Sequence, residues 1–152
     1  MSVANVKRLP FVLSGIPRSR TLLYTNEQLA DRFREVIYVE TFTAETGKHN
    51  SMETAVGVFK TALGDFPTIN LTAQHILQKL TFATAGRLRD MRWLFVRAVQ
   101  IAFTNEKPRI DLPTLSSSFC DVIYKNAQKH RNPFEPEFDG HPLTRAGEPF
   151  AE

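Results

Sequence analysis

The sequence has little of what marks secreted, disulfide-bonded or membrane proteins. Its 152 residues include one cysteine, Cys120, which excludes an internal disulfide framework and metal sites built on paired cysteines. No apolar run approaches the roughly 18 residues that a membrane helix needs, and residues 1–8 contain no apolar signal segment. We therefore expect a protein of the reducing cytoplasm that makes no contact with a membrane.

Complete catalytic motifs are missing as well. The sequence contains no GxxxxGKS or GxxxxGKT phosphate loop, no GxGxxG turn, no HExxH metal motif and no GxSxG nucleophile elbow. Cys120 lies among apolar positions, which is typical of a buried structural thiol. No two histidines have metal-ligand spacing, so we expect no metal site among His49, His75, His130 and His141.

The composition is that of a folded protein with a mildly basic surface. Hydrophobic residues make up 42% and charged residues 23%, which allows a packed core and excludes disorder of the whole chain. The 19 Lys and Arg against 16 Asp and Glu give a net charge of +3, and these charges are dispersed. Such a balance is compatible with nucleic-acid binding without indicating it.

Residues 1–43 carry the pattern of a strand, a helix and a second strand. The apolar run at 9–13 is bounded by glycine and proline, as a buried parallel strand often is. A helix is expected within 19–33, and the β-branched run at 36–39 predicts the second strand. Two strands cannot form a stable sheet by themselves, so this α/β part of the chain looks incomplete.

The remainder of the chain is predicted to be helical. A polar stretch at 44–50 is the expected linker, and four helices are expected over residues 51–131. Asn50 caps the first helix, the second stops near Gly86 and the third follows it. Asp111 caps the fourth, which runs towards residue 129. Residues 132–152 are rich in proline and poor in aliphatic side chains, so we expect an extended or disordered tail.

Several arginines are placed where they could bind phosphate groups. Arg32 is expected at a helix end on the rim of the α/β part, where its guanidinium could reach a phosphate on a neighbouring subunit. The alternative is a surface arginine paired with Asp31 or Glu35. Arg87 and Arg89 come at the start of the third predicted helix, where a basic group opposes the helix dipole.

A bound phosphate could compensate these helix-start arginines, and so could the neighbouring Asp90. Another possibility is a nucleic-acid surface, because phosphate contacts need only positive charge. The residues of such a surface would be Arg92, Arg97, Lys125, Lys129 and Arg131.

Taken together, these segments resemble the C-terminal half of AAA+ ATPases of the TniB/TnsC kind, which regulate DNA transposition with ATP. The order and spacing of the segments match that family across residues 7–134. The stretches that carry the resemblance are LPFVLSGIP (9–17), NEQLADRF (26–33), TAGRLR (84–89), RIDL (109–112) and NPF (132–134). The resemblance implies a remnant of a phosphate-loop AAA+ core over residues 1–43, followed by a helical lid domain over 51–131.

The resemblance also implies roles for individual residues. Ser14 ends the strand that looks like the sensor-1 strand, so it would be the polar group near the γ-phosphate. Arg32 looks like the arginine finger, acting on the ATP of the next protomer. Gly86 begins a stretch similar to the sensor-2 region, in which Arg89 would contact the nucleotide from the lid side and Arg87 is its rival.

The family's phosphate loop and Mg²⁺-binding acidic motif have no counterpart in this sequence. The complete family member uses ATP and Mg²⁺, whereas we expect this chain alone to bind neither tightly and to hydrolyse no ATP. The implied partners are TniB/TnsC-like protomers in an oligomer, a transposase, a target-selection protein, and DNA contacted through the oligomer. The alternative is a small basic helical module that binds protein or DNA without nucleotide.

Overall fold

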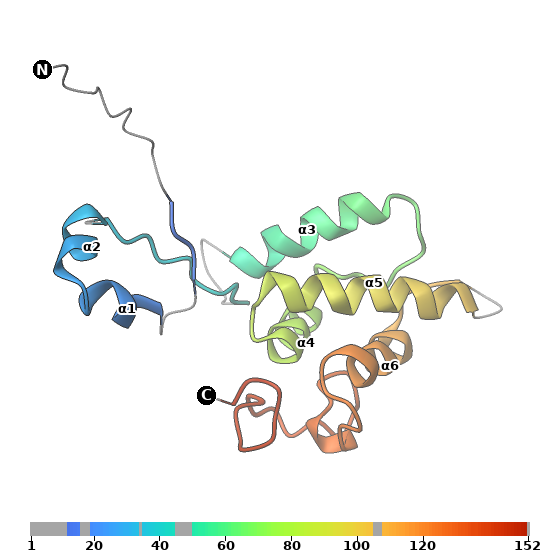
Figure 1. Cartoon of the computed structure of the whole chain (residues 1–152). Helices are drawn as coiled ribbons and strands as arrows, with labels where there is room; N and C mark the ends of the chain where they lie inside the picture. The colour runs from blue at the N-terminus through green and yellow to red at the C-terminus, as the bar shows by residue number, and fades with distance from the viewer. Residues whose placement is uncertain (1–11, 16–18, 34, 45–49, 105–107, 152) are drawn as a thin grey trace, which may run out of the picture. The chain divides into compact units, whose positions relative to one another are not determined.

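Helices provide nearly all of the regular structure in the described part of this protein (Figure 1). The chain divides into two units, residues 1–39 and 40–152. The division falls a few residues before the linker expected at 44–50. The computed structural model describes residues 12–15, 19–33, 35–44, 50–104 and 108–151.

The described part of the N-terminal unit contains two short helices and no buried residue. α1 (Arg20–Tyr24) is followed closely by α2 (Glu27–Arg32). At the start of α2 the side chain of Asn26 accepts a hydrogen bond from the backbone N–H of Gln28 (3.0 Å), which satisfies one of the free amides of the first turn. Local capping therefore helps to define where this helix begins.

The two strands expected in this unit are not seen as strands. Residues 9–11 lie outside the described residues, and residues 12–13 and 36–39 have no strand assignment. Their apolar side chains face solvent, since Val12 is 94% exposed and Val39 is 92% exposed. A strand needs a neighbour to pair its backbone N–H and C=O groups, and the described residues of this unit offer none.

The C-terminal unit contains the four helices expected from the sequence. Two expected caps are confirmed: the Asn50 side chain accepts a hydrogen bond from the N–H of Glu53 (3.1 Å), and Asp111 accepts one from Thr114 (3.0 Å). The last helix ends earlier than expected, before a short 3₁₀ turn, η2 (Lys129–Arg131). The four helices are α3 (Ser51–Leu63), α4 (Gln74–Thr84), α5 (Leu88–Thr104) and α6 (Leu112–Val122).

These four helices enclose a single hydrophobic core. α5 packs most extensively against α6 (Figure 1), and the Ser118 hydroxyl donates to the Leu94 carbonyl (2.7 Å) to join the two helices. Burial of the apolar side chains supplies most of the stability of such a unit. Core residues from all four helices include Met52, Val56, Leu77, Leu80, Met91, Leu94, Leu115 and Phe119.

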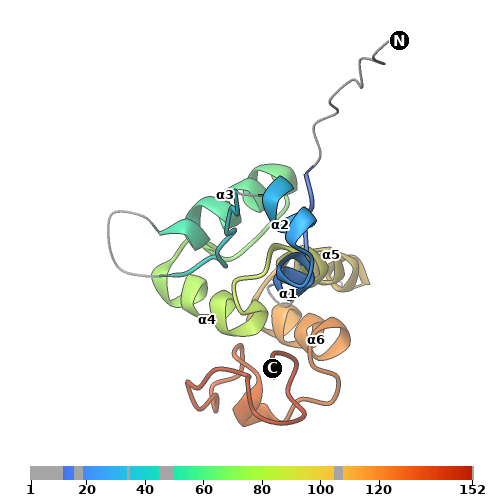
Figure 2. The same ribbon diagram turned by 60° about the vertical axis from the view of Figure 1, so that its left-hand side comes forward.

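The tail folds onto this core, which corrects the expectation of an extended or disordered segment. Within residues 132–151, Phe134, Leu143 and Phe150 are buried in the core cluster. The Asn132 side chain donates to the Ser116 hydroxyl (2.9 Å) and accepts from the N–H of Phe134 (3.1 Å). Figure 2 shows the tail beside α4 and α6. A few apolar anchors therefore order a segment whose average composition favours disorder.

A buried ion pair holds the tail in place. Arg131 is only 4% exposed, and its guanidinium donates to both oxygens of Glu148 (2.6 and 2.8 Å) and to both oxygens of Asp139 (2.7 and 2.8 Å). The hydrogen bonds from Arg131 hold the pKa of Glu148 below its ordinary value, against the opposing effect of burial. Glu148 is therefore a stronger acid in the folded than in the unfolded chain.

This difference in acidity predicts that the stability of the fold decreases as the pH is lowered. Because the unfolded chain takes up the proton on Glu148 first as the pH decreases, folding weakens from about pH 5 towards pH 3. Glu148→Gln should lower the free energy of unfolding at pH 7 by about 2 kcal/mol, because the buried Arg131 is left with Asp139 as its single carboxylate partner instead of two. It should also flatten the acid dependence. Urea unfolding at several pH values measures both effects.

The control is Asp121→Asn, which removes the partner of Arg97 from an ion pair that is largely exposed. An exposed pair is worth at most about 1 kcal/mol, so this variant should differ little from the wild type. Equal effects of the two substitutions would contradict the role given to Arg131.

Candidate functional site

Gly86 sits where the segment after the N-terminal unit meets the start of α5. The N–H of Phe42 donates to the Gly86 carbonyl (2.9 Å), and Gly86 has a φ of 66°. A Cβ on Gly86 would lie 2.1 Å from the Phe42 carbonyl oxygen. Glycine is therefore required here both by the positive φ and by the close approach of the neighbouring backbone.

Further hydrogen bonds fix the same segment to the C-terminal unit, which we call the helical unit because it contains α3–α6. The N–H of Thr43 donates to the Ser51 hydroxyl (3.0 Å), and the Gln74 side chain donates to the Ala44 carbonyl (2.9 Å). Residues 42–44 therefore belong to the body of the helical unit, although the sequence predicted that residues 42 and 43 belong with the α/β part and residue 44 with the linker.

The two arginines that follow Gly86 have different surroundings. The guanidinium of Arg87 lies over the ring of Phe150, 5.0 Å from its centroid. Arg89 is mostly exposed (74% of its side chain), and its Nε donates to Asp90 (3.0 Å). Asp90 therefore compensates the charge of Arg89, which is one of the two possibilities that the sequence leaves open. Arg87 contacts the tail, while Arg89 points to solvent.

Ser14 and Arg32 both belong to the N-terminal unit and are exposed. Arg32 is the last residue of α2 and forms no ion pair with the other described residues. Gly86, Arg87 and Arg89 belong to the other unit. The candidate residues are therefore divided between the two units, and no single unit contains all of them.

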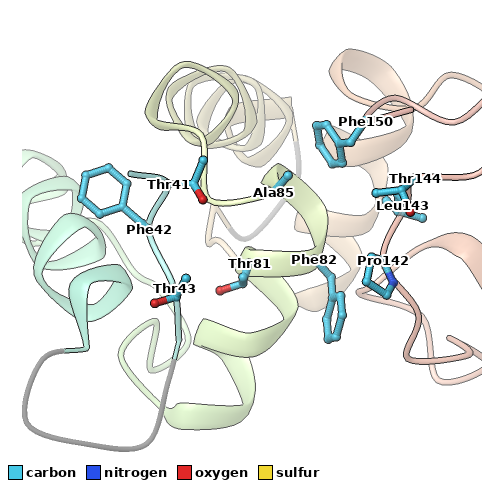
Figure 3. Close-up of a pocket in the computed structure, with 10 residues that line it drawn as sticks. All are labelled: Thr41, Phe42, Thr43, Thr81, Phe82, Ala85, Pro142, Leu143, Thr144 and Phe150. Carbon is cyan, nitrogen blue, oxygen red and sulfur yellow. The ribbon is translucent and has the colours of Figure 1, made fainter. Parts of the chain in front are cut away.

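A mainly apolar pocket of about 190 Å³ lies at the surface of the helical unit (Figure 3). One wall is the fixed segment 41–43, α4 contributes Thr81 and Phe82, and the tail contributes the wall around Phe150. Arg87 lies over the ring of Phe150, which is one of the lining residues. No sequence pattern predicts this pocket, because its walls come from three segments far apart in the chain and the composition of the tail favours disorder.

The basic residues that could form a nucleic-acid surface are not all free to contact phosphates. Arg131 is buried in its ion pairs, and Arg97 is paired with Asp121. Arg92 lies over the neighbouring Trp93 ring, while Lys125 and Lys129 are exposed. A nucleic-acid surface built on these residues loses Arg131, whose guanidinium already donates to two carboxylates.

Cys120 is partly buried and its thiol accepts a hydrogen bond from Asn132 (3.4 Å). Burial raises the pKa of this thiol, which favours the unreactive protonated form. Within the described ranges, no cluster of three or more His, Cys, Asp or Glu side chains could hold a metal ion. None of the described helices has both the length and the apolarity needed to cross a bilayer.

These residues fit only part of a nucleotide site. Arg87 and Arg89 place cations at the start of α5, where Arg87 lies over Phe150 and Arg89 is paired with Asp90. The groups that would hold the β- and γ-phosphates and Mg²⁺ have no counterpart among them. Comparisons with protein-family models, curated proteins and solved structures found no match to the chain.

The close approach at Gly86 generates a prediction. Gly86→Ala should destabilise the helical unit by about 3 kcal/mol or more, because positive-φ strain and displacement of the Phe42 backbone add together. The N–H of Phe42 should then exchange quickly with solvent. Chemical unfolding measures the loss of stability, and amide hydrogen exchange measures the exposure of the Phe42 N–H.

Gly140→Ala is the matched control. Gly140 also has a positive φ (75°), but nothing lies within 4 Å of where its Cβ would be. This variant should cost about 1 kcal/mol and leave the exchange of Phe42 unchanged. If the two alanines have the same effect, the approach of Phe42 does not constrain Gly86.

Proposed function

We propose that this chain is the C-terminal portion of a TniB-like AAA+ ATPase, whose family role is ATP-dependent regulation of DNA transposition. The observation that carries the proposal is the exposure of the two apolar runs in the N-terminal unit. Residues 12–13 and 36–39 are apolar and exposed, and the described part of this unit has no buried residue. Strands of a sheet supplied by another polypeptide segment would cover them.

The helical unit supports the same proposal. α3–α6 occupy the segment in which the family has its lid domain, and the turn at Gly86 leads directly into α5. Arg87 and Arg89 then stand at the N-terminal end of the third of these helices. In the proposed complete protein, Arg89 reaches the nucleotide from the lid side, or Arg87 does so after leaving Phe150.

The proposed roles in the N-terminal unit come from the resemblance, and the exposure of Ser14 and Arg32 is compatible with them. Arg32 is at the end of α2 without an ion-pair partner among the described residues, so its guanidinium is free to act on the ATP of a neighbouring protomer. Ser14 follows the first apolar run and would lie near the attacking water. The phosphate loop and the Mg²⁺ ligands must come from elsewhere, so the isolated chain does not hydrolyse ATP.

The test combines this chain with the N-terminal half of a TniB-like ATPase that carries the phosphate loop. ATP hydrolysis should require both polypeptides. Arg32→Ala should reduce the rate of the mixture by about a thousandfold, the loss typical of removing an arginine finger, without weakening ATP binding. Phosphate release and nucleotide-binding assays separate the two effects.

Lys60→Ala, which removes an equal charge from an exposed position of α3, is the control and should leave the rate unchanged. A mixture that neither binds nor hydrolyses ATP would argue against the proposed family role. A rate insensitive to Arg32→Ala would remove the arginine-finger assignment only.

A further inference from the structure

The walls of the apolar pocket in the helical unit are anchored on both sides of α4. On one side, the N–H of Phe42 donates to the Gly86 carbonyl (2.9 Å). On the other side, Leu143 and Phe150 are buried in the core cluster, and the N–H of Phe150 donates to the Leu143 carbonyl (3.1 Å). The pocket is therefore formed in the free chain, so that a ligand entering it has little of the chain to order.

The size of the pocket limits the ligand to about one ring. Its volume is about 190 Å³. This is well below the roughly 300 Å³ at which pockets for drug-sized molecules begin. It is somewhat larger than an apolar cavity of about 150 Å³ that is known to bind benzene. A single six-membered ring with one small substituent therefore fits the available space.

The lining determines the polarity of the ligand. None of the ten described lining residues is charged, and four of them are threonines (Figure 3). The other lining residues are Phe42, Phe82, Ala85, Pro142, Leu143 and Phe150. Arg87, which lies over Phe150, is not one of the lining residues. A charged group would lose its hydration here without gaining a partner, whereas an uncharged aromatic ring packs well against phenylalanine rings.

Thr81 provides a polar contact for such a ring. Its hydroxyl donates to the Leu77 carbonyl one turn earlier in α4 (2.9 Å). Figure 3 shows this hydroxyl pointing from α4 towards Thr43 on the opposite wall. Because a hydroxyl has a single proton, the Thr81 oxygen can only accept a hydrogen bond from a ligand. A ligand with an O–H or N–H group therefore suits this wall.

We propose that this pocket binds a small uncharged compound with one aromatic ring and one hydrogen-bond donor, of the kind that phenol represents. The ring covers apolar side chains of three segments, and the donor binds the Thr81 oxygen. The bound compound contacts the segment 41–43, α4 and the tail together, so it stabilises the folded helical unit. This site is independent of nucleotide binding and of the proposed family.

Three compounds of similar size test the chemical class. Phenol is the probe, toluene lacks its donor, and benzoate adds a negative charge. Titration of the full chain with phenol should shift the backbone amide NMR signals of Phe42, Thr81 and Leu143 until they saturate, and should raise the unfolding temperature. Benzoate should bind about tenfold more weakly or worse, because the pocket offers its charge no partner.

Variants test the location. Thr81→Phe should abolish phenol binding, because its ring fills the pocket. Thr81→Val keeps the shape of the side chain and removes the acceptor. It should weaken phenol binding by about fivefold, the effect of one neutral hydrogen bond, and leave toluene binding unchanged.

Thr61→Phe is the matched control. The Thr61 hydroxyl makes the same kind of bond to the Gly57 carbonyl (3.0 Å), and Thr61 is exposed on α3 outside the pocket. This variant should bind phenol like the wild type. Circular dichroism checks that all three variants are folded.

Four results would overturn the proposal. The first is the absence of saturable shifts with phenol, and the second is phenol binding by Thr81→Phe equal to that of the wild type. The third is equal binding of benzoate and phenol, which would place a cation at the site. The fourth is tighter binding of N-acetylphenylalanine amide than of phenol, which would make the occupant a side chain of a partner protein.

Discussion

The need to cover apolar side chains governs how this protein is built. In the helical unit, α3–α6 cover one another, and the tail covers what remains with Phe134, Leu143 and Phe150. The N-terminal unit has comparable apolar runs at 12–13 and 36–39, yet its described residues bury none of them. The same physical requirement is met within the C-terminal unit and is unmet among the described residues of the N-terminal unit, and this contrast supports the proposed function.

Two polar contacts decide which segments join the helical unit. At one end, the backbone of Phe42 is held against Gly86, so the chain is fixed to the helices before α3 begins. At the other end, Arg131 binds Glu148 and Asp139 and closes the tail onto the core. The apolar pocket lies between these two additions and is walled by both. Its shape is therefore a consequence of how the segments on either side of the four helices are anchored.

The sequence predicted the parts of the fold that depend on local signals. Caps at Asn50 and Asp111 and the apolar periodicity of α5 identified the helices, because each signal acts within one or two turns. The sequence did not predict the ordered tail, because Arg131 and Glu148 are distant in sequence. Composition alone cannot show that Arg131 will be buried or that it will pair with Glu148. Of the candidate residues, Gly86 is predicted from the resemblance to lie in a nucleotide site. The structure shows a different reason for glycine at this position, which is the close approach of the Phe42 backbone. The roles of Ser14, Arg32 and Arg89 remain predictions from resemblance.

The most direct test of this account is amide hydrogen exchange measured by mass spectrometry on the isolated chain. Amides in the core helices α5 and α6 should exchange slowly, because they are held by the buried core. Amides at 12–15, 36, 37 and 39 should exchange within seconds, because the described residues contain no strand that pairs with them. Slow exchange of residues 36–39 in the isolated chain, comparable to that of α5, would show that the N-terminal unit folds without another polypeptide and would contradict the central claim.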